Sequence, residues 1–80
     1  MKGIERHTVM KTYANPPSHC DICHNIITTD FYDACIRAPR LIWANVCPPC
    51  FKHYGIGLGT GKGQHFHHDS SINKFVKVEG

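Results

Sequence analysis

Two Cys-x-x-Cys pairs constrain this chain more than any other feature of its sequence. Cys20 and Cys23 form the first pair, Cys47 and Cys50 form the second, and residues 24–46 separate them. Four thiolates with this spacing can meet at one tetrahedral metal ion, and zinc is the metal most typical of such sets. The sequence therefore predicts one structural Zn²⁺ ion with all four of these cysteines as its ligands.

The length of the chain gives this ion an energetic role. A chain of 80 residues makes one small domain, whose hydrophobic core rarely supplies more than about 3–5 kcal/mol of stability. Zinc held by thiolates contributes on the order of 10–16 kcal/mol of apparent binding free energy, which is available to folding. We expect a single zinc-binding domain over residues 1–80, with a zinc core over about residues 18–55, a glycine-rich loop over 55–63 and a C-terminal strand over about 73–79.

Between the cysteine pairs the sequence predicts a β-hairpin. Residues 31–37 and 41–46 are rich in aromatic and β-branched side chains, and the three residues between them are short enough for a turn. The same kinds of residue predict a further short strand over residues 6–13.

The second cysteine pair is expected to open a helix. Proline is favoured at the first helical position, so a helix is predicted from Pro48 to about Tyr54, with Gly55 as a left-handed C-cap. A helix that carries the second ligand pair is the treble-clef arrangement, whereas two knuckles would make a zinc ribbon. Neither Cys23 nor Cys50 is followed by the glycine that ribbon knuckles often use, which favours the treble clef. The predicted fold class is a small metal-stapled α+β domain, treble-clef or zinc-ribbon-like.

The number of cysteines and the first residues bear on the compartment. Secreted disulfide scaffolds normally carry an even number of cysteines behind a signal peptide. This chain has five cysteines and begins without an apolar run. No segment approaches the roughly 20 apolar residues of a membrane span. We expect a cytoplasmic protein with no membrane association, in which Cys35 is a buried thiol and not a ligand.

The charge distribution leaves two classes of partner open. The net charge is +3, with +2 on residues 1–19, −1 on residues 20–50 and +2 on residues 51–80. This is mild compared with the dense basic clusters of nucleic-acid-binding proteins, so a protein partner and a nucleic-acid partner both fit. One or two of the aromatic residues are expected at an interface: Trp43, Phe31, Tyr32 and Tyr54. The other tentative binding residues are Arg37 and Arg40 in the hairpin and Gly59, Gly61, Lys62 and Gly63 in the glycine-rich loop.

The glycine-rich loop has glycine at every second position from Gly55 to Gly63. A phosphate-binding loop needs Gly, four residues and then Gly-Lys-Ser/Thr, but here Lys62 is followed by Gly63. The dinucleotide motif also lacks its βαβ context, so we expect no nucleotide cofactor. Two interpretations remain: an anion-binding nest helped by Lys62, or a tight loop that passes close to the core. The second is favoured.

A histidine-rich segment suggests an alternative function. His65, His67 and His68 with Asp69 could hold a second metal ion in a small metal-dependent nuclease, because His65 and His67 would share one face of a strand. Exposed polar positions in a loop are the interpretation that we favour. The four cysteines close the coordination shell of the zinc against catalysis. We therefore expect a protein that is not an enzyme.

The stretch from Trp43 to Gln64 reads WANVCPPCFKHYGIGLGTGKGQ. It resembles a recurring pattern in small four-cysteine zinc-finger proteins of bacteriophages and prophages, in which Trp-Ala-Asn-x-Cys-x-x-Cys leads into Gly-Leu-Gly-Thr-Gly-x-Gly-Gln. Residues 18–23 are similar to the opening of the same family. The resemblance implies a phage origin and a zinc ion held by four cysteines. Because phage proteins of this size are often regulators or inhibitors, we expect a non-enzymatic binding module that acts on a host protein or nucleic acid.

Overall fold

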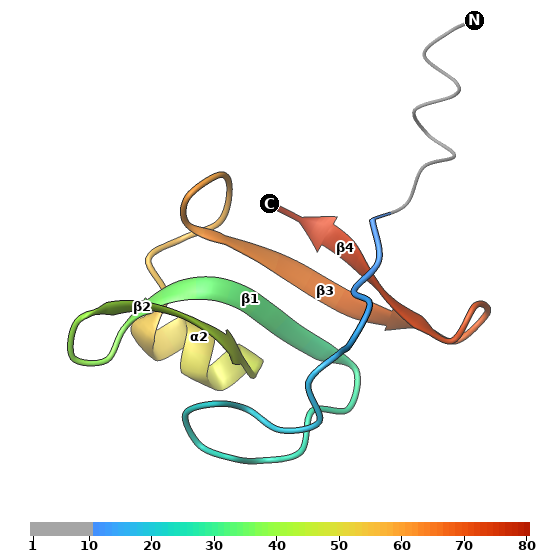
Figure 1. Cartoon of the computed structure of the whole chain (residues 1–80), viewed down its shortest axis with the longest axis horizontal. Coiled ribbons are helices and arrows are strands. Elements are labelled where there is room, and N and C mark those ends of the chain that lie inside the picture. The colour runs from blue at the N-terminus through green and yellow to red at the C-terminus, as the bar shows by residue number, and fades with distance from the viewer. Residues whose placement is uncertain (1–10) are drawn as a thin grey trace, which may run out of the picture.

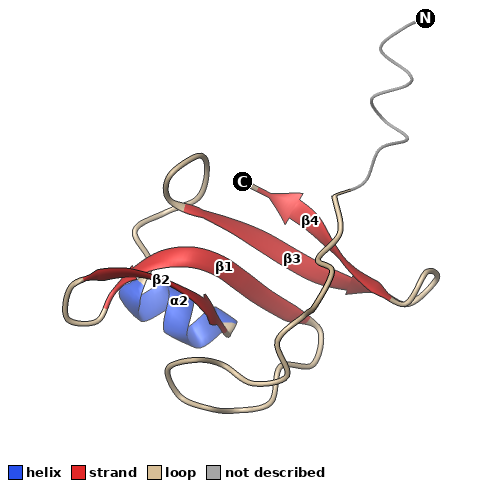
Figure 2. Cartoon of the chain, in the orientation of Figure 1, coloured by secondary structure: helices blue, strands red, loops and turns tan. Residues whose placement is uncertain are grey.

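The computed structural model describes residues 11–80, in which one short helix lies against one face of the strands (Figures 1 and 2). The elements in chain order are β1 (Asp30–Arg37), β2 (Leu41–Val46), α2 (Pro48–Tyr54), β3 (Gly63–Asp69) and β4 (Lys74–Glu79). The predicted hairpin, the helix and the C-terminal strand are confirmed to within one residue at each end. In this part of the chain, no helix has the length and apolar character of a membrane span.

The four strands form one antiparallel sheet in the order β2-β1-β3-β4. β1 is central, because it pairs with β2 through Ala34↔Ala44 and with β3 through Phe31↔Phe66. β2 therefore lies at one edge of the sheet and β4 at the other. A cis peptide bond joins Ala38 to Pro39 in the turn between β1 and β2.

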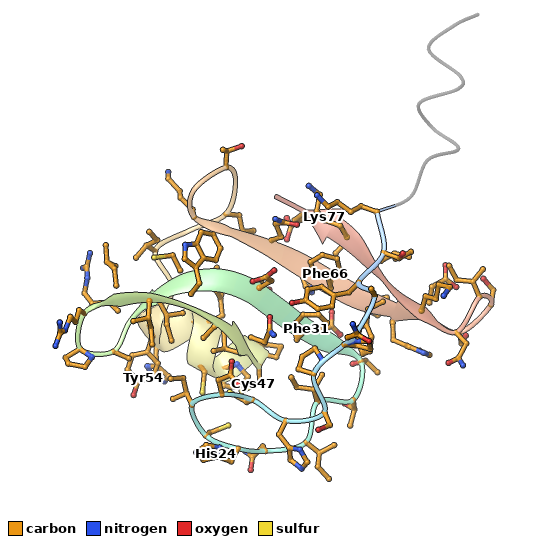
Figure 3. All side chains as sticks on the ribbon, viewed as in Figure 1. His24, Phe31, Cys47, Tyr54, Phe66 and Lys77 are labelled. Carbon is orange, nitrogen blue, oxygen red and sulfur yellow. The ribbon has the colours of Figure 1, made fainter. Side chains whose placement is uncertain are left out.

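Each face of the sheet carries its own apolar cluster. On the face covered by α2, Ile36, Ala44 and Val46 pack with Cys20 and Cys50. Since side chains alternate along a strand, Phe31 points to the opposite face. There it packs with Ile27, Phe66 and Phe75, and Tyr13 covers them. Figure 3 shows Phe31 and Phe66 side by side beneath the N-terminal part of the described chain.

The predicted strand over residues 6–13 is not formed in the part of it that the structure describes, and residues 6–10 lie outside that part. Residues 11–13 run beside the outer edge of β4 and make one isolated bridge, between Thr12 and Val76. The Tyr13 N–H donates to the Phe75 carbonyl at 3.0 Å, and the Lys77 N–H donates to the Lys11 carbonyl at 2.8 Å. This segment covers the β4 edge and supplies Tyr13 to the aromatic cluster.

The predicted left-handed C-cap at Gly55 is wrong. Gly55 is extended, with φ −69° and ψ 155°, and it makes a bridge to Ile36 of β1. Glycine is required here by close approach, because an added Cβ would lie 2.5 Å from Cδ1 of Phe51. The chain leaves α2 directly toward β1, and a left-handed residue would turn it elsewhere.

The glycine-rich loop arches from the end of α2 to the start of β3 (Figure 1). Its tip closes on itself, because the N–H groups of Gly59, Lys62 and Gly63 all donate to carbonyls within residues 59–63, at 2.8–3.0 Å. Gly59 and Gly61 have φ of +112° and +77°, which favours glycine. Gly63 lies against β1, where an added Cβ would be 2.7 Å from the Cβ of Ala34.

Replacing Gly63 with alanine should lower the free energy of unfolding by about 1–3 kcal/mol, because the added methyl overpacks the β1–β3 contact. Thr60→Ala, at the exposed tip of the same loop, serves as the control and should change stability by less than about 0.5 kcal/mol. Denaturant unfolding followed by circular dichroism measures both values. Equal stabilities for the two variants would contradict the packing role of Gly63.

Candidate metal centre

The structure brings the four paired cysteines together. The Sγ atoms of Cys20, Cys23, Cys47 and Cys50 all lie within 4.8 Å of one another, and those of Cys23 and Cys47 are 3.6 Å apart. None of these cysteines is in a disulfide. Figure 3 shows Cys47 where β2 meets α2, above the loop that carries the first pair. The cluster has the ligand type, number and spacing to bind a metal ion.

The first pair is held by a tight turn. The Cys20 N–H donates to the Asn25 carbonyl at 2.9 Å, and the His24 N–H donates to the Cys20 carbonyl at 3.0 Å. The Ile22 N–H points at the Cys20 Sγ at 3.4 Å, as expected for a turn that presents thiolates. His24 has φ +66°, so this turn uses the left-handed conformation although it has no glycine there.

The second pair is placed by the start of α2. Cys47 is the N-cap residue, its side chain makes no capping hydrogen bond, and prolines follow it at the first helical positions. The Sγ of Cys47 is therefore free to face the cluster. The Phe51 N–H donates to the Cys47 carbonyl at 2.9 Å, which places Cys50 in the first turn on the buried side of the helix.

The four thiols differ in burial. Cys20 and Cys50 are buried, Cys47 is half-buried and Cys23 is exposed. Burial raises the pKa of Cys20, but hydrogen bonds from the backbone N–H groups of Cys23, Cys47 and Ile22 outweigh it and lower the pKa to about 6. Burial raises the pKa of Cys47 and Cys50. Because thiolates are the ligands, binding of a metal would release protons from Cys47 and Cys50.

Two residues that the sequence did not single out tie the first pair to the sheet. The Asp21 N–H donates to the Asn45 carbonyl at 2.9 Å, and the Asn45 N–H donates to Oδ2 of Asp21 at 2.8 Å. Both bonds use the outer edge of β2, directly before the second pair. An aspartate inside Cys-x-x-Cys carries no local signal for this contact, because its partner lies 24 residues away.

The fifth cysteine is not part of the cluster. Cys35 lies on β1 and is only 7% exposed, which confirms the prediction of a buried thiol. Its N–H donates to the Lys62 carbonyl at 2.9 Å, so β1 holds the end of the glycine-rich loop at this point.

The tentative binding residues occupy different places. Trp43 is 54% exposed on β2 and Tyr54 is 40% exposed at the end of α2, whereas Phe31 is buried and Tyr32 is half-buried. Arg37 and Arg40 are exposed on either side of the hairpin turn, and Lys62 is exposed in the glycine-rich loop. Gly59 and Gly63 use their N–H groups inside the loop, and Gly63 is buried.

The histidine-rich segment is not a loop, contrary to the interpretation that we favoured. It belongs to β3, because Phe66 completes the aromatic cluster and draws its neighbours into the sheet. His65 and His67 share one face, as a strand predicts, and both contact Asp30 of β1. His68 instead bonds Oδ1 of Asn73, and Asp69 accepts two hydrogen bonds from Ser71.

Comparison with protein-family models, with curated proteins and with solved structures finds no match to this chain. The chemistry of the cluster and the surface around it are therefore the basis for inferring a function.

Proposed function

We propose that this chain is a zinc-stabilised binding module without catalytic activity, encoded by a bacteriophage or prophage. It acts as a regulator or inhibitor in the host cytoplasm, through the exposed outer edge of β2. The single observation that carries the proposal is a run of three exposed apolar residues on this edge strand: Leu41, Ile42 and Trp43 are 53%, 44% and 54% exposed.

Zinc is the proposed ion because of the ligand set and its spacing. A Zn–S distance of about 2.3 Å places the sulfurs of a tetrahedral site about 3.8 Å apart, close to the 3.6 Å between Cys23 and Cys47. Four thiolates leave no coordination position for a substrate, which supports a structural role. Five thiols without a disulfide favour a reducing compartment.

The fold that we propose for the zinc core is a treble clef. Its first ligand pair lies in a turn, the β1–β2 hairpin follows, and the second pair lies at the start of α2. A zinc ribbon would need a second turn in place of the helix.

The outer edge of β2 has backbone groups free to bind a partner. Asn45 turns its N–H and carbonyl outward, toward Asp21. Backbone groups alternate in direction along an antiparallel strand, so those of Leu41 and Trp43 also point away from β1. Neither makes an outward backbone hydrogen bond within residues 11–80. An exposed edge of this kind can accept another strand.

An open pocket lies near this edge, on the face opposite α2, between residues 11–15 and strands β1 and β3. It has a volume of about 520 Å³ and is lined by Tyr13, Asp33 and Phe66, among others. Asp33 pairs with Asn45 of β2, two residues from Trp43. Burial raises the pKa of the Asp33 carboxyl, so a basic group on a partner would find a poorly solvated carboxylate there. Together, the edge, Trp43 and the cavity fit an extended segment of a host protein.

The experiment is an affinity capture from host lysate with the wild type, Trp43→Ala and Ile72→Ala. Ile72 is also exposed, at 40%, but lies in the turn between β3 and β4. A partner that uses the β2 edge should be lost with Trp43→Ala and kept with Ile72→Ala. With the purified partner, Trp43→Ala should weaken binding about 30-fold or more, which is the size expected of a central aromatic contact. Equal capture by all three proteins would contradict the proposed surface.

Two substitutions at Leu41 test whether the partner binds as an added strand at the β2 edge. Proline at the start of an edge strand removes an outward N–H and leaves the ladder to β1 intact. Leu41→Pro should therefore weaken binding more than Leu41→Ala, although both lose the same side chain. Equal affinities of the two variants would mean that the partner contacts only side chains and does not hydrogen-bond to the backbone of β2.

Nucleic acid is the second candidate partner, because Arg37 and Arg40 are exposed on either side of the turn that leads into β2. Trp43 is the only tryptophan, so its fluorescence reports binding directly. Titration with DNA and RNA at two salt concentrations decides this candidate, since phosphate contacts weaken steeply as salt rises. No fluorescence change at low salt would exclude it.

A further inference from the structure

We propose that Asp30, His65 and His67 form a second metal site that binds a divalent transition-metal ion such as Zn²⁺, independently of the four cysteines. The sheet brings these residues together from two strands. His67 is the direct partner of Asp30 across the β1–β3 pair, and His65 lies two residues away on the same strand and the same face.

The donor atoms already converge on one carboxylate. Nε2 of His65 lies 2.7 Å from Oδ2 of Asp30, and Nδ1 of His67 lies 3.1 Å from the same oxygen. Around a zinc ion, with metal–ligand distances of about 2.1 Å, neighbouring ligand atoms lie about 3.4 Å apart. The two contacts to Asp30 would open only slightly, but the three ligand atoms do not all lie within 4.8 Å of one another, so His67 must turn toward His65 to admit an ion. His67 has room to turn, because its side chain is 51% exposed.

The neighbours of His65 hold its ring in the orientation that a ligand needs. Nδ1 lies 3.4 Å from Oε1 of Glu79, on β4, while Nε2 faces Asp30. A ligating histidine usually donates its other ring N–H to a carboxylate, which fixes the tautomer. Tyr32 stacks on the His65 ring with centroids 4.4 Å apart and an interplanar angle of 14°. The imidazole is thus oriented by both its edge and its face.

The electrostatics of the cluster favour a cation. Hydrogen bonds from His65, Thr29 and His67 outweigh the effect of burial and lower the pKa of the Asp30 carboxyl. Asp30 is therefore ionised at neutral pH, with the Glu79 carboxylate beside His65. Two imidazoles and a carboxylate are a ligand set that suits zinc and similar metals, and three protein ligands leave positions open to water or to a further ligand.

This site differs from the histidine cluster expected from the sequence. It takes its carboxylate from β1 and omits His68 and Asp69, which contact Asn73 and Ser71. It is linked to the cysteine centre through a stack on the α2 face, because Tyr32 also stacks on Phe51 with centroids 4.0 Å apart, and Phe51 directly follows Cys50.

The test is a Zn²⁺ titration of tag-free, full-length protein that already carries one zinc ion per chain. Calorimetry and metal analysis after desalting should find a second equivalent in the wild type. His65→Ala, His67→Ala and Asp30→Asn should each lose the second equivalent and keep the first. His68→Ala, on the same strand and the other face, should keep both. Glu79→Gln should bind the second ion about 10-fold more weakly.

Cobalt identifies the ligands of the second ion. Co²⁺ added to the zinc-loaded protein should give visible d–d bands without the strong near-ultraviolet charge transfer of cobalt–thiolate bonds. The proposal is overturned if the wild type binds one equivalent only, if the second equivalent survives the double change of His65 and His67 to alanine, or if thiolate charge transfer accompanies it. Circular dichroism of each variant ensures that folded proteins are compared.

Discussion

Replacing Cys50 with serine should unfold the domain. Cys50 is 8% exposed and belongs to both the cysteine cluster and the apolar cluster under α2. Loss of one ligand removes most of a metal contribution on the order of 10–16 kcal/mol, while a core this small supplies about 3–5 kcal/mol. Far-ultraviolet circular dichroism should show loss of native structure at room temperature, and a chelator should have the same effect on the wild type.

Cys35→Ala is the matched control for this prediction. Cys35 is also buried, at 7% exposure, but lies outside the cluster. The variant should stay folded, bind one metal ion at the cysteine centre and lose only modest stability. If Cys50→Ser keeps a native spectrum and the thermal stability of the wild type in the presence of a chelator, the structural role of the metal is excluded.

Replacing Phe31 with alanine should lower the free energy of unfolding by about 3–5 kcal/mol. Phe31 is fully buried and stacks on Phe66 with centroids 5.3 Å apart. Tyr13 and Phe75 each meet its ring edge-to-face at 5.1 Å. Removal of the ring leaves a cavity at the centre of the aromatic cluster. Urea unfolding, followed by the fluorescence of Trp43, measures the loss.

Trp43→Ala controls for the deletion of an aromatic ring. Because Trp43 is more than half exposed, the variant should lose less than about 1 kcal/mol, measured by circular dichroism since its fluorescence is absent. A cost for Phe31→Ala as small as that for Trp43→Ala would mean that the aromatic cluster does not stabilise the sheet. A metal centre that stays loaded while Phe31→Ala loses stability would show that the two clusters contribute separately.

The two apolar clusters explain how so small a chain can hold a four-stranded sheet. The cysteine centre fixes β2, α2 and the near part of β1, through Cys47, Cys50 and the Asp21–Asn45 hydrogen bonds. The aromatic cluster joins the far part of β1 to β3 and β4. β1 carries residues of both clusters, Phe31 and Ile36. Disruption of either cluster therefore removes packing contacts of the central strand.

The residues near the cysteine pairs could be predicted because their signals are local. Pro48 and Pro49 set the start of α2, and the Ala38-Pro39-Arg40 turn sets the hairpin, each within a few residues of its effect. Local signals gave the wrong prediction at Gly55, which is not a left-handed C-cap. Glycine is needed there because the ring of Phe51 packs against its backbone. The prediction was also wrong for residues 65–69, because histidines look like loop residues unless the aromatic cluster around Phe66 is known.

The four clustered cysteines, the helix that presents Cys50 and the hairpin between the two pairs follow from the amino-acid sequence alone. They depend on side-chain chemistry and on short-range backbone preferences, which act between residues close together along the chain. The folded sheet was needed to establish that β3 pairs with β1, that Asp30 meets His65 and His67, and that Trp43 lies on an open edge. These features arise from contacts between residues far apart in the sequence, such as Asp30 and His65, which are 35 positions apart, or from the lack of a neighbouring strand within residues 11–80. No local pattern specifies which strands become neighbours, because that choice depends on which apolar faces bury each other best.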